Sequence, residues 1–410
     1  VVDGATISIY SLRYGLYRLM ASTSTNSTLV INGGNITVGD CFFVEAPAAN
    51  STTTIVTVWA SPTLTNLNLT LNFGNITLYT GTTQIGSPTT FIATDTIANS
   101  NIIMSVGSIS LISAYSTHTA SALTVSGSSP YSEQYIFNGD IYNGARIYIV
   151  SALATTTSSV NFKTKYLNRG SGTRSANISL SNFKTITFEQ GYLSNDSSVV
   201  QYPIYLSSIN NDIIFNGNVE VSGSSNSGIQ ISSSNASTTI NGDLIRNSNI
   251  VSSVFSVLSL GSYTGALKIN GDIIEQASAR TSESTSATFS LISASTGSTE
   301  CNNIISTGRS NIIIYSSQPN SGLIKINGSI DCSGVYVFTN TAVTYSAIYI
   351  SGINTPITVL GDVIASNSGS VTLFFFFWVI LFRQAGQSGA INIYGTCYGG
   401  NRQRAIDQFT

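Results

Sequence analysis

A short motif recurs along this chain: an apolar residue, Asn, Gly, Asp and a second apolar residue. It is clearest in KINGDIIEQ (268–276), with near-copies in TINGDLIRN (239–247), IFNGDIYNG (136–144), KINGSIDCS (325–333) and TVLGDVIAS (358–366). Single steps between its glycines run from 25 residues (217 to 242) to 41 residues (33 to 74). Two longer steps contain weaker copies, SNFKTITFEQ (181–190) and CNNIISTG (301–308). Repeats of this length indicate a solenoid, a propeller or an array.

Between the motifs, apolar and polar residues alternate over four to six positions, as in GIQIS (228–232) and SAIYIS (346–351). This is the two-residue period of a β-strand, and the Ser, Asn and Gly clusters between such runs mark turns. Helical spacing is nearly absent after residue 22, which excludes helical arrays, and propeller blades are longer, at about 40–50 residues. We therefore predict an all-β fold, a parallel β-solenoid of about 11–12 coils. Its strands would stack about 4.8 Å apart, giving a rod of roughly 55 Å.

The motif itself is predicted to form the corner between two strands of a coil. Asn tolerates the left-handed backbone conformation and Gly adopts it freely, the Asp can accept bonds from local backbone N–H groups, and stacked Asn side chains can form a ladder. The motif carboxylates would then lie near one edge as weak candidates for a metal site: Asp140, Asp243, Asp272 and Asp362. Turn chemistry is the preferred interpretation, because Asn218 and Ser329 replace the Asp in other copies and the calcium-loop signature is missing.

Composition limits the function. Charged residues make up 8% of the chain, against about 25% in a typical soluble domain. The chain should nevertheless fold, because it is 42% hydrophobic and contains 20 Tyr and 18 Phe. A net charge of −2 provides no basic surface for nucleic acid. No apolar stretch reaches the roughly 20 residues of a membrane-spanning helix.

The two ends differ from the repeats. YSLRYGLYRLMAS (10–22) has helical spacing, with Leu12, Leu16 and Leu19 on one face and Arg13 and Arg18 beside it. It is predicted to be a short helix that caps the open end of the solenoid, or else a surface that docks onto another subunit. The predicted division is 1–30 for the N-terminal cap and first strand, 31–370 for the repeats, and 371–410 for an apolar strand, the last coil and the C-terminal tail.

The stretch VTLFFFFWVILF (371–382) breaks the alternation, so bulky apolar groups would face both inward and outward. Burial under the C-terminal tail CYGGNRQRAIDQFT, contact with a neighbouring subunit, and contact with a lipid surface are the alternatives. The predicted assembly residues are Phe374, Phe375, Phe376, Phe377, Trp378, Ile380 and Phe382.

No residue set indicates a particular reaction. Walker A, GxGxxG and HExxH motifs are missing, and acidic residues are too thinly spread for paired carboxylate catalysis. GTCYG (395–399) resembles a cysteine nucleophile elbow, but the single histidine, His118, lies about eight coils away. We predict no catalytic residue, no cofactor and no enzyme activity. Cys301 and Cys332 lie about one repeat apart, so they are either a disulfide between neighbouring coils or buried free thiols.

Nine Asn-x-Ser/Thr sequons permit N-glycosylation, although chance alone predicts roughly ten in such a composition. They begin at Asn26, Asn35, Asn50, Asn68, Asn75, Asn177, Asn195, Asn235 and Asn327.

In its NG-D-apolar corners, in units such as SGAINIYG (388–395), and in its Ser/Thr/Asn-rich coils, the chain resembles right-handed parallel β-helix surface proteins, such as adhesins, autotransporter passengers and viral fibres. The resemblance implies an exported role at a cell or virion surface. We expect an extracellular structural protein, a subunit of a filament, sheath or fibre that assembles with identical copies through its ends and residues 371–382. The alternative is a glycan-binding or polysaccharide-degrading spike, with Tyr315, Tyr345 and Tyr349 forming a wall for sugars.

Overall fold

The computed structural model describes residues 2–9, 23–25, 28–38, 57–65, 68–72, 76–80, 90–98, 101–113, 120–126, 132–141, 145–151, 158–164, 166–168, 177–194, 204–221, 228–232, 234–247, 257–276, 290–295, 297–306, 312–316, 322–331, 346–352, 356–365, 378–383, 390–399 and 406–409. Its contacts divide the chain into two units, residues 1–190 with 195–212 and residues 191–194 with 213–410. In the described part of the chain the regular elements are strands, without a helix.

In the first unit, two sheets are built from parallel strands. The first sheet contains β1 (Val2–Ile9), β3 (Thr28–Val38), β5 (Asn68–Asn72), β6 (Ile76–Thr80), β8 (Asn101–Val106), β9 (Ile109–Ser113), β11 (Ser132–Phe137), β13 (Ser158–Phe162) and β16 (Thr185–Phe188). The second contains β2 (Thr23–Thr25), β4 (Thr57–Thr65), β7 (Thr90–Ala98), β10 (Ala120–Ser126), β12 (Ala145–Val150), β15 (Asn177–Ser181) and β18 (Ile204–Ser207). The short strand β14 (Tyr166–Asn168) follows β13.

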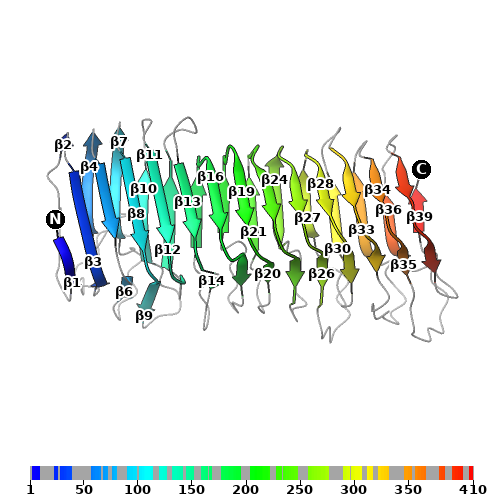
Figure 1. Cartoon of the computed structure of the whole chain (residues 1–410), viewed down its shortest axis with the longest axis horizontal. Helices are drawn as coiled ribbons and strands as arrows, with labels where there is room; N and C mark the ends of the chain where they lie inside the picture. Colours follow the sequence, from blue (N-terminus) through cyan, green and yellow to red (C-terminus); the bar gives the residue numbers. More distant parts are fainter. Residues whose placement is uncertain are drawn as a thin grey trace, which may run out of the picture. The chain divides into compact units, whose positions relative to one another are not determined.

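In the second unit, parallel strands form three sheets, whose strands are labelled in Figure 1. Its first sheet contains β19 (Asp212–Phe215), β22 (Ser237–Ile240), β25 (Leu267–Ile269), β28 (Thr299–Cys301), β31 (Ile324–Ile326), β34 (Ile357–Val359) and β37 (Ile391–Ile393). The second contains β21 (Ile229–Ser232), β24 (Leu258–Tyr263), β27 (Ser290–Ser295), β30 (Ile312–Ser316), β33 (Ser346–Gly352), β36 (Trp378–Arg383) and β39 (Ile406–Phe409). The third contains β17 (Tyr192–Ser194), β20 (Val219–Val221), β23 (Leu244–Arg246), β26 (Ile273–Glu275), β29 (Ile304–Ser306), β32 (Ile330–Asp331), β35 (Val363–Ala365) and β38 (Cys397–Gly399).

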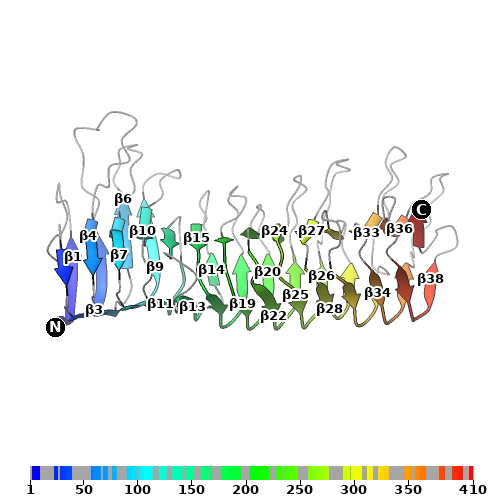
Figure 2. The same cartoon turned by 90° about the horizontal axis from the view of Figure 1, so that it is seen from above.

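One coil of the second unit is therefore a strand of the second sheet, a strand of the first and a strand of the third, in that order. The pattern repeats from β21–β22–β23 to β36–β37–β38. Figure 2 shows the same strands from a perpendicular direction. Because every strand pairs in parallel with its counterpart in the next coil, equivalent residues form columns along the stack.

The core lies inside the coils and is made by alternate residues of each strand. In β26, Ile273 and Glu275 are buried and Ile274 between them is half-exposed. In β31, Ile324 and Ile326 are buried around the half-exposed Lys325. Each inward apolar side chain contributes about 1.5–3 kcal/mol relative to exposure, and the column arrangement repeats this contribution in every coil.

Aromatic residues occupy one core column of the first unit. The rings of Phe137 and Phe162 stack at a centroid distance of 5.0 Å and an angle of 15°. Phe162 and Phe188 stack at 4.8 Å and 12°. These separations match the spacing of adjacent strands, so identical inward residues on successive coils bring their rings face to face.

The core of the second unit also contains two charged residues. Arg246 and Glu275 end strands β23 and β26, are register partners, and are only 7% and 0% exposed. Since an isolated buried charge is strongly unfavourable, their placement in one column of adjacent strands indicates mutual compensation. Neither residue stands out in the sequence, where IRN and IEQ read as ordinary strand ends.

The prediction of an all-parallel β-solenoid is confirmed. The total of 11–12 coils and the right hand of the helix stay predictions, as does the division at residues 30 and 370. The cap helix predicted at 10–22 lies outside the described residues.

Candidate functional site

A row of polar side chains marks the corner between the first and third sheets of the second unit. We call it the corner row: Asn218, Asp243, Asp272, Asn303, Ser329, Asp362 and Thr396. The side-chain oxygen of each member before Thr396 accepts a hydrogen bond from the backbone N–H of the next member, at 2.8–3.0 Å throughout. The recurring Asp thus joins neighbouring coils through a side-chain-to-backbone hydrogen bond. The predicted role as an acceptor for backbone N–H groups is correct, but the donor belongs to the next coil rather than to the same turn.

The corner row also locates the weak metal candidates. Asp243, Asp272 and Asp362 lie in it and use Oδ1 as the acceptor. Asp140 lies in the first unit and accepts a hydrogen bond from the Thr164 hydroxyl. Within the described ranges, three or more His, Cys, Asp or Glu residues are nowhere grouped closely enough to hold a metal ion.

The glycines of the motif have a different role from the one predicted. Left-handed backbone was expected at the NG corner, but Gly242, Gly271 and Gly361 do not have a positive φ. A Cβ on Gly271 would lie 2.3 Å from Oδ1 of Asp243 and 2.5 Å from the carbonyl oxygen of Gly242. Glycine is needed here because the corners of successive coils approach too closely for a side chain.

Left-handed backbone occurs at other corners. Among the described non-glycine residues, Asn182 (φ 63°) and Ser208 (φ 53°) have it, each directly after a strand of the second sheet of the first unit. Gly191 has φ 78°. The sequence offered no means of distinguishing these corners from the NG corners, since all of them are small and polar.

The predicted asparagine ladder is confirmed. Nδ2 of Asn270 donates to Oδ1 of Asn241 at 2.7 Å, and Nδ2 of Asn241 donates to Oδ1 of Asn216 at 2.9 Å. Asn302 continues the ladder by donating to the carbonyl oxygen of Asn270 at 2.7 Å. A side-chain amide donates through its NH2 group and accepts through its oxygen, so a stack of amides of any length can satisfy both groups.

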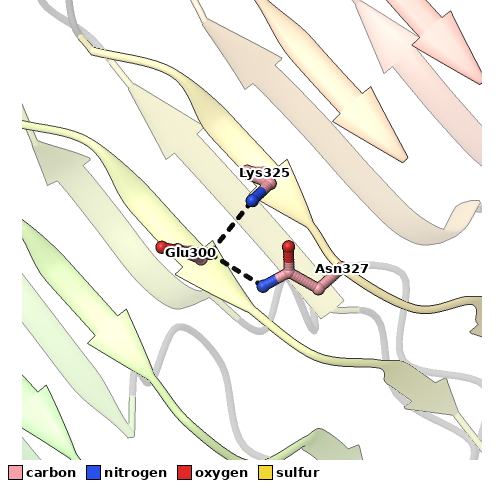
Figure 3. Close-up of polar contacts among 3 residues, drawn as sticks. All are labelled: Glu300, Lys325 and Asn327. Atoms are coloured by element: carbon pink, nitrogen blue, oxygen red, sulfur yellow. Dashed lines mark hydrogen bonds and ion pairs between the residues drawn. The ribbon is translucent and has the colours of Figure 1, made fainter. Parts of the chain in front are cut away.

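The outer face of the first sheet carries a charged cluster that the sequence did not single out. Oε1 of Glu300 accepts hydrogen bonds from Nδ2 of Asn327 at 2.8 Å and from Nζ of Lys325 at 3.3 Å (Figure 3). The Asn327 bond is the main cause that lowers the pKa of Glu300, and Lys325 and Lys268 add to it while partial desolvation opposes it. Lys268, Glu300 and Lys325 are register partners on β25, β28 and β31. Alternating charges on a solvated face stabilise the stacking modestly.

Of the two alternatives for Cys301, a disulfide with Cys332 or a buried free thiol, the structure has the buried free thiol. The register partner of Cys301 in the next coil is Ile326, and Cys332 lies outside the described residues. Burial raises the pKa of Cys301 to about 12, with the nearby carboxylates of Asp272 and Glu300 adding to the effect. Cys397 of GTCYG is a free and exposed thiol, and His118 lies outside the described residues.

Half of the apolar segment is an internal strand. Residues 378–383 form β36, which pairs with β33 on one edge and with β39 of the C-terminal tail on the other. Trp378, Ile380 and Phe382 therefore belong to a strand whose two edges are occupied by the same chain. Phe374, Phe375, Phe376 and Phe377 lie outside the described residues.

The coil that contains β37 and β38 is less well covered than the coil before it. Ile391 and Ile393 of β37 are half-exposed, although their register partners Ile357 and Val359 are 0% exposed. Tyr394, directly after β37, is 72% exposed. Among the described strands, β37 pairs with β34 alone and β38 with β35 alone, so each has one edge that no described strand occupies.

The sequons and the tyrosines of the predicted sugar wall are spread over several strands and turns in the part of the chain that is described. Of the sequons, Asn235 is exposed, while Nδ2 of Asn327 is engaged with Glu300. Asn35, Asn68 and Asn177 lie within strands. Asn26, Asn50, Asn75 and Asn195 lie outside the described residues, as does Tyr345. Tyr315 pairs with Ser351 and Tyr349 with Ile313, so these two tyrosines are not register partners.

Comparison with known proteins identified no matching family model, no similar curated protein and no similar solved structure. In the part of the chain that is described, no helix has the length and apolar character needed to cross a membrane.

Proposed function

We propose that the protein is an extracellular structural subunit that stacks end to end with identical copies into a filament, sheath or fibre. The observation that carries this proposal is that Ile391 and Ile393 of β37 are half-exposed, although they continue a core column that is fully buried one coil earlier. A further parallel coil would complete the burial of both side chains. Because they are already partly buried, each would contribute less than the roughly 1.5–3 kcal/mol of full burial.

The backbone at this end supports the same conclusion. The carbonyl oxygen of Ala390 and the N–H of Tyr394 bond to β34. Because alternate residues of a strand in a parallel ladder bond to opposite sides, the N–H and C=O groups of Ile391 and Ile393 face the free edge. In the first unit, β1 pairs with β3 alone among the described strands. A second copy that places the free edge of its β1 beside β37 would extend the ladder in parallel.

The surface chemistry agrees with close packing of copies. At 8% charged residues, the repulsion between neighbouring molecules is small, and hydroxyl and amide groups supply the polar surface. The extracellular placement rests on the resemblance to β-helix surface proteins.

Negative-stain electron microscopy with sedimentation velocity tests end-to-end assembly. The wild type should form filaments, and Ile391→Lys/Ile393→Lys should remain short, because two charges would be buried in each junction. Thr358→Lys is the matched control, since Thr358 lies on the outer face of β34, one coil away. Monomeric wild type at high concentration would refute the proposal, and so would equal shortening by the control.

A second candidate, glycan binding, is favoured by the exposed rings of Tyr394 and Tyr398, which are 72% and 50% accessible. Binding on a glycan array that disappears in Tyr394→Ala/Tyr398→Ala, without filaments in the wild type, would favour this function over assembly.

A further inference from the structure

The outer face of the third sheet carries an apolar column that the proposed end-to-end stacking does not use. Ile245, Ile274 and Ile305 are the middle residues of β23, β26 and β29 and are register partners on consecutive coils. Each is half-exposed between two buried neighbours, so its side chain faces outward. We call these three residues the outer stripe.

The contrast with the first sheet shows that the outer stripe is not a general property of these coils. In the same three coils, the outward middle residues of the first sheet are Thr239, Lys268 and Glu300. Those side chains are what a solvated solenoid face requires, whereas contiguous outward isoleucines are typical of a contact surface.

The surroundings of the outer stripe are acidic. Glu220 and Asp331 occupy the same column, one coil before and one coil after the stripe. Asp243 and Asp272 of the corner row lie beside it in its own coils, immediately before β23 and β26. Among the described residues of the third sheet the one cation is Arg246, which is buried. A partner should therefore combine apolar groups with positive charge.

Pairing of two identical stripes is disfavoured by this arrangement. Glu220 and Asp331 lie two coils on either side of Ile274. In a two-fold contact centred on Ile274, Glu220 of one copy therefore faces either Asp331 or Glu220 of the other. Both arrangements place carboxylate against carboxylate at a desolvated edge.

We propose that the outer stripe of one copy binds residues 10–22 of a second copy. This segment contains Leu12, Leu16 and Leu19 at helical spacing, carries Arg13 and Arg18, and has no acidic residue. As a helix it would place Leu12 and Leu19 about 10.5 Å apart. Ile245 and Ile305, two strand spacings apart, are separated by about 9.6 Å. The apolar lengths match, and the arginines would lie over the acidic rim.

The contact is independent of end-to-end stacking and joins copies through a side of the coil. It predicts that the two kinds of contact can be removed separately. A variant that no longer forms filaments through β37 would still bind the segment.

Fluorescence anisotropy with a labelled peptide of residues 10–22 tests the proposal. The receptor is the full chain carrying Arg13→Glu/Arg18→Glu, which prevents its own segment from competing. Saturable binding is expected, weakened at least tenfold by Ile274→Lys and by Glu220→Lys in the receptor, and weakened further as salt is raised. Thr239→Lys, on the first sheet of the same coils, should leave the affinity unchanged.

Circular dichroism of each variant checks that the fold is retained. If Ile274→Lys does not fold, Glu220→Lys still tests the contact between the outer stripe and the peptide. No saturable binding would overturn the proposal. Equal weakening by Thr239→Lys, or undiminished binding of a peptide with both arginines changed to glutamate, would overturn it as well.

Discussion

The backbone N–H of Asp272 donates a hydrogen bond of 2.8 Å to Oδ1 of Asp243, across the boundary between two coils. Asp272 in turn offers its own Oδ1 to Asn303 in the following coil. The five inner residues of the corner row, from Asp243 to Asp362, are therefore both backbone donors and side-chain acceptors, and the recurring motif fixes the register of one coil on the next. A second copy stacked through the same side-chain-to-backbone hydrogen bonds would continue this register from one molecule to the next.

Removing one acceptor from the corner row should destabilise the second unit. Oδ1 of Asp272 accepts from the backbone N–H of Asn303 at 3.0 Å and from its Nδ2 at 2.9 Å. Asp272→Ala should lower the free energy of unfolding by about 1–3 kcal/mol, because part-buried donors lose their partner. Asp272→Asn keeps an oxygen in place and should have a much smaller effect. Urea denaturation followed by circular dichroism measures both; equal losses would show that the acceptor has no role.

The motif glycines should be intolerant of any side chain. In Gly271→Ala the Cβ would lie 2.3 Å from Oδ1 of Asp243, so the two coils must separate locally, and we expect a loss of at least about 2 kcal/mol. Gly261 is the matched control, because the nearest atom to its added Cβ is Oγ of Ser232 at 3.8 Å. Gly261→Ala should be close to neutral in the same denaturation experiment. A small loss in the free energy of unfolding for Gly271→Ala would show that neighbouring corners can accommodate a Cβ atom.

The parts that the sequence predicted correctly are those encoded by every coil in the same way. Alternating apolar residues specify an inward and an outward face, and stacked amides at Asn216, Asn241 and Asn270 follow from a recurring Asn at a corner. Both depend only on the period of the chain. The solenoid and its ladder could therefore be predicted without any knowledge of a relative.

The errors arose where the answer depends on the neighbouring coil. The role of Gly271 depends on the atoms of Asp243 in the preceding coil. The choice between the two alternatives for Cys301 likewise depends on register, which makes Ile326 its neighbour. A separation of about one repeat places two residues in adjacent coils but does not place them in the same sheet. The outer stripe was missed for a related reason: three-residue strands such as IIE and IIS are too short to show which apolar residue faces outward.

The charged cluster of the first sheet should make stability depend on pH. The folded-state pKa of Glu300 is lowered from its ordinary value of 4.5, so its stabilising contribution is fully present above that value and is lost as the pH falls through the lower folded-state pKa. Glu300→Gln removes the charge but keeps an acceptor for Asn327. The difference in melting temperature between wild type and Glu300→Gln should be small, because the group is solvated, and should vanish at acidic pH. Glu220→Gln serves as the control for loss of one acid elsewhere. A difference that is constant with pH would contradict the assignment.

The two described cysteines should differ sharply in reactivity. The thiolate is the reactive form, and burial raises the pKa of Cys301 to about 12, whereas Cys397 is exposed. Brief treatment of the native protein with iodoacetamide at pH 8, followed by peptide mass spectrometry, should find Cys397 modified and Cys301 intact. In urea both cysteines should react, which shows that each can be modified and detected once the protein is unfolded. Modification of Cys301 in the native state would show that the first-sheet core opens readily at this coil. A Cys301–Cys332 peptide in the non-reduced digest would contradict the register that pairs Cys301 with Ile326.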